Sequence, residues 1–185
     1  MMKKLLFAVL LVAGISSVNA QEVKFGVKTG LNVATIRGNA LDVDPRIGLH
    51  IGGVAELKLT PKFSIQPELL FSQLGTENSN NKLRTDYISL PIMAKYYLVK
   101  GFSIEAGPQF SFLVKDELEF VVNNNNSGSF NPNVSNFDFG LNVGMGYQFE
   151  KGFFFQTRYS LGITTIEENP DVRNGVFQLS LGYQF

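Results

Sequence analysis

The chain has 185 residues, of which 44% are hydrophobic, and this suits a single domain without marking it as soluble or membrane-embedded. Its 16 basic and 16 acidic residues balance, which argues against a nucleic-acid partner. There is no cysteine, so disulfides and thiolate metal ligands are excluded and stability must come from packing and hydrogen bonds.

Residues 1–20 have the layout of a secretory signal peptide. Two lysines precede an apolar run from Leu5 to Ile15, and small residues follow up to Ala20. The run is too short to span a bilayer. We predict cleavage after Ala20, which leaves a domain of residues 21–185 with 14 basic and 16 acidic residues and a net charge of −2.

The remaining chain alternates apolar and polar residues with a period of two and shows no helical period. In the first segment, for example, Phe25 and Val27 alternate with Lys24 and Lys28. Such alternation predicts β-strands with one apolar and one polar face. Eight segments show it: residues 23–33, 47–59, 63–73, 87–98, 102–114, 137–149, 153–164 and 176–185.

The connections between these segments alternate in length. Three are tight turns, at residues 60–62, 99–101 and 150–152. The others are long and cover roughly residues 34–46, 74–86, 115–136 and 165–175. Short periplasmic turns and long external loops are typical of transmembrane β-barrels. We therefore predict an all-β, eight-stranded antiparallel up-and-down barrel in a bacterial outer membrane, with both termini in the periplasm.

Period two does not say which face points inward, so a soluble barrel with an apolar interior is the alternative. The polar face carries nearly balanced charges among small residues, which suits a narrow lumen where buried ions must pair. The apolar face is bulky throughout, as expected of a lipid-facing surface. The polar network predicted for the lumen comprises Lys24, Lys28, His50, Glu56, Lys58, Glu68, Lys95, Glu105, Asp138 and Arg158.

Aromatic residues of the apolar face fall at one end of the predicted barrel. With the termini in the periplasm, they form a girdle at that side of the membrane, and Phe and Tyr fill it because the chain has no Trp. Its members are Phe25, Phe63, Tyr96, Phe102, Tyr147, Phe149, Phe153, Tyr183 and Phe185.

Four segments carry a resemblance to a known family. FGVKTGLN at residues 25–32, ISLPI at 88–92, EAGPQ at 105–109 and LGYQF at 181–185 resemble the PorT-like family of small outer-membrane β-barrel proteins. The resemblance implies the barrel, its location and a proline within a strand, here Pro91; some members act in type IX secretion. Tyr183 and Phe185 also resemble the C-terminal signal that the barrel-assembly machinery reads.

His50 is the only histidine and the first candidate for catalysis. Barrel enzymes that acylate or deacylate lipid A use a His with a Ser and an acid. Alternation places His50 on the lumen face, away from lipid. We therefore expect no enzymatic activity, no cofactor and no metal centre.

The long connections hold the remaining functional signal. Residues 115–136 are rich in Asn, Ser and Gly, which predicts a solvated loop. Two other loops bring together acidic residues that could hold Ca²⁺ or Mg²⁺ between lipopolysaccharide head groups, although an acidic rim is the simpler reading. These acids are Asp42, Asp44, Glu167, Glu168 and Asp171.

We thus predict a structural or surface-binding barrel with a plugged polar lumen. Its partners would be outer-membrane lipid and lipopolysaccharide, the barrel-assembly machinery, and an extracellular or envelope protein at the loops. A narrow pore for small solutes, a lipid-modifying barrel enzyme and a barrel associated with type IX secretion remain as alternatives.

Overall fold

The computed structural model describes residues 22–38, 44–77, 81–123, 126–130, 135–164 and 172–185, so the predicted signal peptide lies outside it. The described residues form nine strands. They are β1 (Val23–Gly38), β2 (Asp44–Thr60), β3 (Phe63–Glu77), β4 (Asn81–Val99), β5 (Phe102–Asn123), β6 (Asn126–Phe130), β7 (Phe137–Gln148), β8 (Phe153–Gly162) and β9 (Val172–Gln184). No helix in these ranges is long and apolar enough to cross a membrane.

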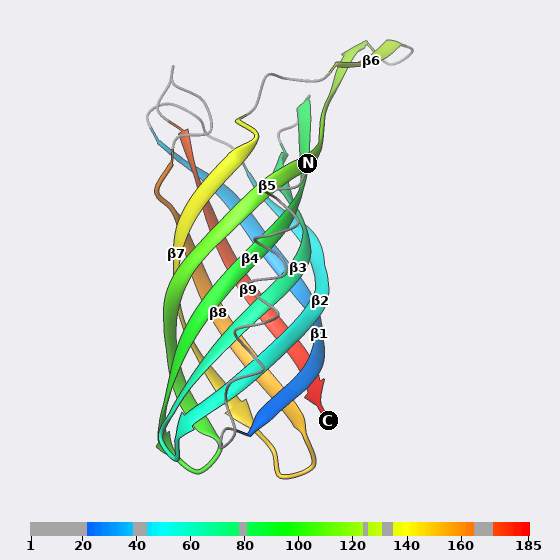
Figure 1. The fold of residues 1–185 in the computed structure, drawn as a ribbon. Helices are drawn as coiled ribbons and strands as arrows, with labels where there is room; N and C mark the ends of the chain where they lie inside the picture. The colour runs from blue at the N-terminus through cyan, green and yellow to red at the C-terminus, as the bar shows by residue number, and fades with distance from the viewer. Residues whose placement is uncertain (1–21, 39–43, 78–80, 124–125, 131–134, 165–171) are drawn as a thin grey trace, which may run out of the picture.

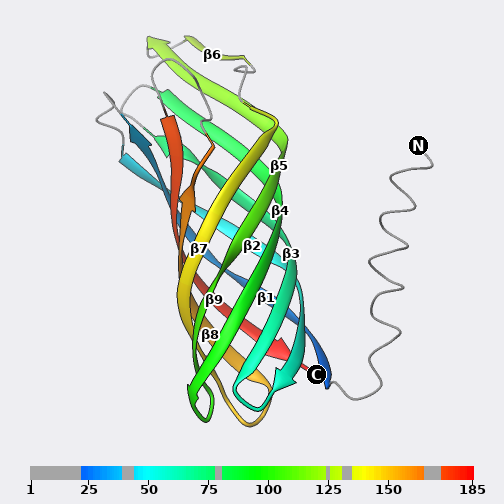
Figure 2. The ribbon, with the colours of Figure 1, turned by 60° about the vertical axis from the view of Figure 1, so that its left-hand side comes forward.

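Eight of the strands close into a barrel (Figures 1 and 2). All pairings are antiparallel, in the order β4-β3-β2-β1-β9-β8-β7-β5, and β4 pairs with β5 to complete the circle. The first and last strands meet along a ladder that runs from Gly26 and Gln184 to Gly38 and Val172. This confirms the predicted eight-stranded antiparallel barrel, and each predicted strand has an observed counterpart.

Three tight turns lie together at one end, which we call the turn end, and the opposite end is the loop end. Two of these turns depend on glycine, because Gly101 and Gly152 have φ angles of 83° and 88° in the left-handed region. A Cβ at Gly152 would also collide with the carbonyl oxygen of Gln184. The chain end at Phe185 lies at the turn end as well.

The strands extend further toward the loop end than the alternation indicated, and the predicted bounds of two long connections were wrong. Residues 34–46 shrink to 39–43 between β1 and β2, and residues 74–86 shrink to 78–80 between β3 and β4. β5 continues to Asn123 and pairs on one side with β4 as far as Asn81, and on the other with β6. The prediction of a solvated loop over residues 115–136 was therefore wrong for Lys115–Asn123 and for β6. Backbone pairing with β4 and β6 satisfies the peptide groups of these segments and extends the hairpin beyond the predicted strand.

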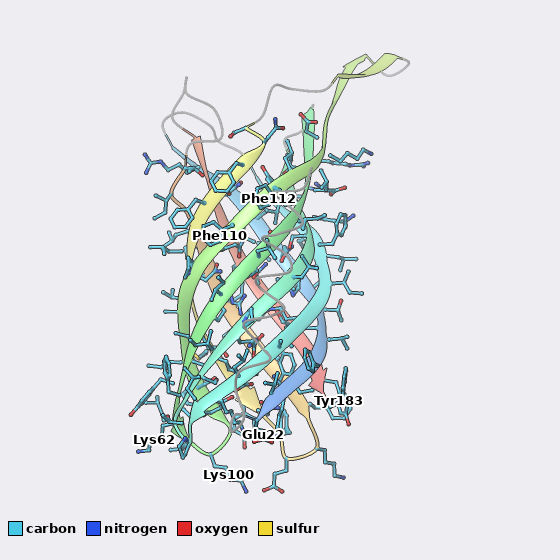
Figure 3. The ribbon with its side chains drawn as sticks, in the orientation of Figure 1. Glu22, Lys62, Lys100, Phe110, Phe112 and Tyr183 are labelled. Atoms are coloured by element: carbon cyan, nitrogen blue, oxygen red, sulfur yellow. The ribbon has the colours of Figure 1, made fainter. Side chains whose placement is uncertain are left out.

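The outward face of the barrel is apolar along its length. Seven of the nine predicted girdle residues are exposed on it, and Phe63 and Phe102 are half-buried. Ring centroids lie 4.9 Å apart for Tyr147 and Phe149, and 5.0 Å apart for Phe153 and Tyr183. Nearer the loop end, Phe110 and Phe112, labelled in Figure 3, pack with tilted rings against Phe139 and Phe137 of β7, at centroid distances of 5.3 and 5.5 Å.

The interior is polar but not uniformly so. Toward the loop end, Ala34, Leu74, Tyr87 and Val176 form a buried apolar cluster, with Leu113 against it. The alternation missed this cluster because most of its members fall at or beyond the ends of the predicted strands. Further buried apolar side chains are Val54, Leu70, Met93 and Phe154.

Candidate functional site

The centre of the lumen is crossed by ion pairs around Glu68, a buried residue of β3. Arg158 of β8 donates two hydrogen bonds to its carboxylate, of 2.8 and 3.0 Å. The ammonium of Lys28 on β1 lies 2.8 Å from the same group. In the closed sheet β3 and β8 are four strands apart in either direction, so the arginine pair spans the full width of the lumen.

A second group of contacts surrounds Glu56 on β2, nearer the turn end. Its carboxylate accepts hydrogen bonds from Lys95 at 3.1 Å and from Ser64 at 2.8 Å. Gln184 donates to it at 2.9 Å, and so does the hydroxyl of Tyr97. The carboxylate thus has a full set of donors, as a buried charge requires.

Glu105 on β5 connects these two groups. The amide of Gln156 donates to both of its oxygens, at 3.0 and 3.1 Å, while Arg158 lies 3.5 Å away and Lys95 lies 3.9 Å away. Three cations and three carboxylates therefore share one buried cluster, which we call the ion network. Its charged members are Lys28, Glu56, Glu68, Lys95, Glu105 and Arg158.

His50 lies in the lumen outside the ion network. Its Nδ1 is 2.8 Å from Oδ1 of Asn32 and its Nε2 is 2.8 Å from Oγ of Ser180. Gln178 donates a hydrogen bond of 2.9 Å to the same Asn32 oxygen. All four side chains are buried and form an interior chain of hydrogen bonds, in which both ring nitrogens of His50 have partners and only Oε1 of Gln178 lacks one.

Three residues predicted for the lumen network do not join the ion network and lie toward the two ends of the barrel. Lys24 and Lys58 are half-exposed at the turn end and pair with Glu22, at 3.2 and 3.6 Å. The hydrogen bond from Lys24 and the charge of Lys58 lower the pKa of Glu22. Asp138 lies toward the loop end and accepts hydrogen bonds from Thr164 and Asn174, at 2.6 and 2.8 Å.

Sequence reasoning also missed the neutral partners of the ion network. Alternation places them on the polar face, but only charged residues and His50 were singled out there. The structure shows that amides and hydroxyls complete the coordination of the three carboxylates. The missed residues are Ser64, Gln66, Tyr97, Gln156 and Gln184.

The acids predicted to hold a divalent cation lie almost entirely outside the described residues. Among them, no three His, Cys, Asp or Glu side chains lie close enough to hold an ion. Four of the five acids proposed for Ca²⁺ or Mg²⁺ lie outside the described ranges, and of Asp44 only the backbone at the start of β2 is described. The acids outside are Asp42, Glu167, Glu168 and Asp171.

The turn end is hollowed and basic. A cavity of about 1020 Å³ opens there, lined by the lysines 24, 58, 100 and 151 and by girdle aromatics. A smaller hollow of about 360 Å³ lies beside it and shares Lys58, Lys100 and Gln148 with it. Below these residues the hydrogen bond between Gln148 and Gln184, at 2.6 Å, is joined to the ion network through Glu56.

Comparison with known proteins agrees with this architecture. Ail, the attachment invasion locus protein of Yersinia pestis, superposes with a TM-score of 0.58 at 14% identity, over 89% of this chain and 99% of that one. Neisserial surface protein A superposes with a TM-score of 0.61 at 10% identity, with the same coverage. At such identities the likeness shows the fold alone, and no curated protein matches the chain.

Residues 19–168 match the family described as the outer membrane protein beta-barrel domain. The match covers most of the chain and agrees with the closed barrel and its apolar outer face. The chain therefore belongs to this family and is a β-barrel of the bacterial outer membrane.

Proposed function

We propose that this barrel is a structural or surface-binding protein with a plugged lumen, and that its loop end makes the functional contacts. The observation that carries the proposal is the ion network, whose pairs cross the lumen between Arg158 and Glu68. An eight-stranded barrel has only enough interior volume for its side chains. A filled interior favours a function in recognition at the surface. It disfavours the pore alternative, in which small solutes pass through the lumen.

The proposal places the turn end in the periplasm and the loop end outside the cell. Short periplasmic turns and longer external segments are usual in outer-membrane barrels, and the β5–β6 hairpin and the 163–171 connection at the loop end support this orientation. The loop end would then meet lipopolysaccharide and any extracellular or envelope protein partner. Membership of the narrower PorT-like group, with type IX secretion as an alternative role, rests on the sequence resemblance.

The loop end carries a projecting hairpin, and the turn end has none. Beyond Phe112, where β7 begins beside it, β5 continues for eleven residues and carries β6 on its edge. Figures 1 and 2 show this hairpin projecting past the rim of the barrel. Binding sites are commonly formed by such extensions on a rigid scaffold.

The experiment replaces residues 117–131 with a short Gly-Ser turn in the chromosomal copy of the gene. The barrel should still fold, because loop length has a weak effect on closure entropy and the ion network is untouched. Folding is measured by the shift in gel mobility between heated and unheated samples. The strain should show the phenotype of the null strain, and full complementation by the shortened barrel would contradict a role for the hairpin.

A second candidate function follows from the contacts of His50. Ser180, His50 and Asn32 form the hydrogen-bonded sequence of nucleophile, base and orienting group found in hydrolases. All three are buried inside the barrel, which supports a structural role. A fluorophosphonate probe separates the two: labelling of the native protein that is lost in Ser180→Ala would favour the enzyme.

A further inference from the structure

The turn end concentrates lysines that neither the fold nor the proposed function requires. Each tight turn carries one, at Lys62, Lys100 and Lys151, and Lys24 and Lys58 line the mouth beside them. Figure 3 shows Lys62 and Lys100 at the tips of their turns. The chain as a whole has no net charge, so this cationic end reflects a local segregation of charge.

The acidic residues at this end do not neutralise the lysines. Glu150 pairs with Lys100 at 2.6 Å, and both side chains are more than 80% exposed. Glu22 is shared between Lys24 and Lys58. Lys62 and Lys151 have no acidic partner within the described residues, so the turn end keeps an excess of positive charge.

The lysines lie directly beyond the aromatic girdle. The wall of the larger cavity combines four ammonium groups with the aromatic side chains of Tyr147, Phe149, Phe153, Tyr183 and Phe185. Figure 3 shows Tyr183 on the barrel wall above the turns that hold Lys62 and Lys100. Aromatic girdles mark the boundary between acyl chains and head groups, so side chains one step further out lie at the level of lipid phosphates.

We propose that the turn end is a binding surface for anionic phospholipids. The headgroup phosphate lies among Lys100, Lys151 and the neighbouring lysines, and the glycerol and first acyl carbons lie against the girdle. A basic residue at a membrane surface raises the affinity for anionic lipid by roughly fivefold. The choice of phospholipid over lipopolysaccharide rests on the proposed function, which places the turn end at the periplasmic side of the membrane. The lipid contact itself does not depend on what the loop end binds.

The test uses the full folded barrel in phosphatidylcholine vesicles with spin-labelled lipids. Electron paramagnetic resonance gives the association of labelled phosphatidylglycerol with the barrel relative to labelled phosphatidylcholine. We expect the native barrel to prefer phosphatidylglycerol several-fold. The triple variant Lys62→Gln/Lys100→Gln/Lys151→Gln should lose most of this preference, and the matching triple Lys→Arg variant should keep it.

Two single variants sharpen the test. Glu150→Gln should strengthen the preference, because it releases Lys100 from its exposed partner, and Lys115→Gln near the loop end should leave it unchanged. A native barrel with no preference, or a folded triple Gln variant with the native preference, would overturn the proposal. Retention of the full preference at 1 M salt, roughly a 3 Å screening length, would also contradict a phosphate–lysine contact.

Discussion

Arg158 and Glu68 are 90 positions apart in the sequence and are joined by two hydrogen bonds across the full width of the barrel. Such a bidentate pair is geometrically specific and is strengthened by the low dielectric of the interior. Glu68 also binds Lys28, so one carboxylate serves two cations. Its removal would leave both cations buried without their main partner.

Glu68→Gln is therefore expected to destabilise the barrel by about 3–5 kcal/mol, the usual cost of breaking a buried ion pair from one side. The measurement is urea unfolding in lipid vesicles. Glu150→Gln is the matched control, because it removes the carboxylate of an exposed pair and should leave the free energy of unfolding close to the native value. Equal losses in the two variants would show that the ion network does not hold the barrel together.

Conductance tests the plugged lumen. The native barrel in planar bilayers should show no large, steady single-channel current, because ion pairs cross its centre. Replacing both partners, as in Glu68→Gly/Arg158→Gly, removes the central pair and should raise the current. A large native conductance, unchanged in the double variant, would promote the pore alternative.

Two Gly→Ala changes, one in a tight turn and one on the outer face, should differ in their effect on the free energy of unfolding. Gly152→Ala places a Cβ at a left-handed position and against the carbonyl oxygen of Gln184, so it should destabilise the barrel by at least about 1–2 kcal/mol. Gly53→Ala puts the same methyl group on the outer face, where the nearest atom is 3.9 Å away. Urea unfolding compares the two, and a similar loss for both would contradict the turn argument.

Deletion of Phe185 should lower the amount of folded barrel in the outer membrane and raise its degradation in the periplasm, if the terminal aromatic is read during assembly. The side chain is 74% exposed, so little packing is lost with it. Spontaneous folding of the purified variant into vesicles should therefore remain near native. Phe153→Ala removes a comparable exposed aromatic from the girdle and should leave cellular levels unchanged; unchanged levels in the deletion would refute recognition of this end.

Protease added to intact cells tests the orientation. Cleavage should fall within residues 115–136 first, because the hairpin projects beyond the barrel. Mass spectrometry of the released peptides locates the cut. Cleavage at this position only after the outer membrane is breached would mean that the barrel is oriented the other way.

Alternation was sufficient to predict the fold and the direction of most interior side chains. Lys28, His50 and Arg158 all lie inside the lumen, as their positions in the alternating pattern predicted. Lys24 belongs to the same face of β1 but lies at the mouth of the barrel. A period of two gives the face of the strand on which a residue lies, but not its position along the barrel axis. Depth follows from the register between strands, which the sequence does not display.

The extension of β5 could be predicted only in part. Leu118 and Phe120 alternate with Glu117 and Glu119, which is a strand signal that a loop assignment overlooked. The segment Asn126–Phe130 has no such pattern, and its strand conformation comes from pairing with β5. Tertiary pairing of this kind leaves no periodic trace in a single sequence.

The shared carboxylate of Glu68 also constrains how the chain can evolve. A neutral or reversed charge at position 68 leaves two buried cations without their main partner, so a tolerated change there requires compensating changes at positions 28 and 158. Among relatives that keep this interior, positions 28, 68 and 158 should therefore vary together, although 68 and 158 are separated by half the length of the chain. Substitutions of lumen residues would then be accepted in compensating sets, while substitutions at lipid-facing positions would be accepted one at a time.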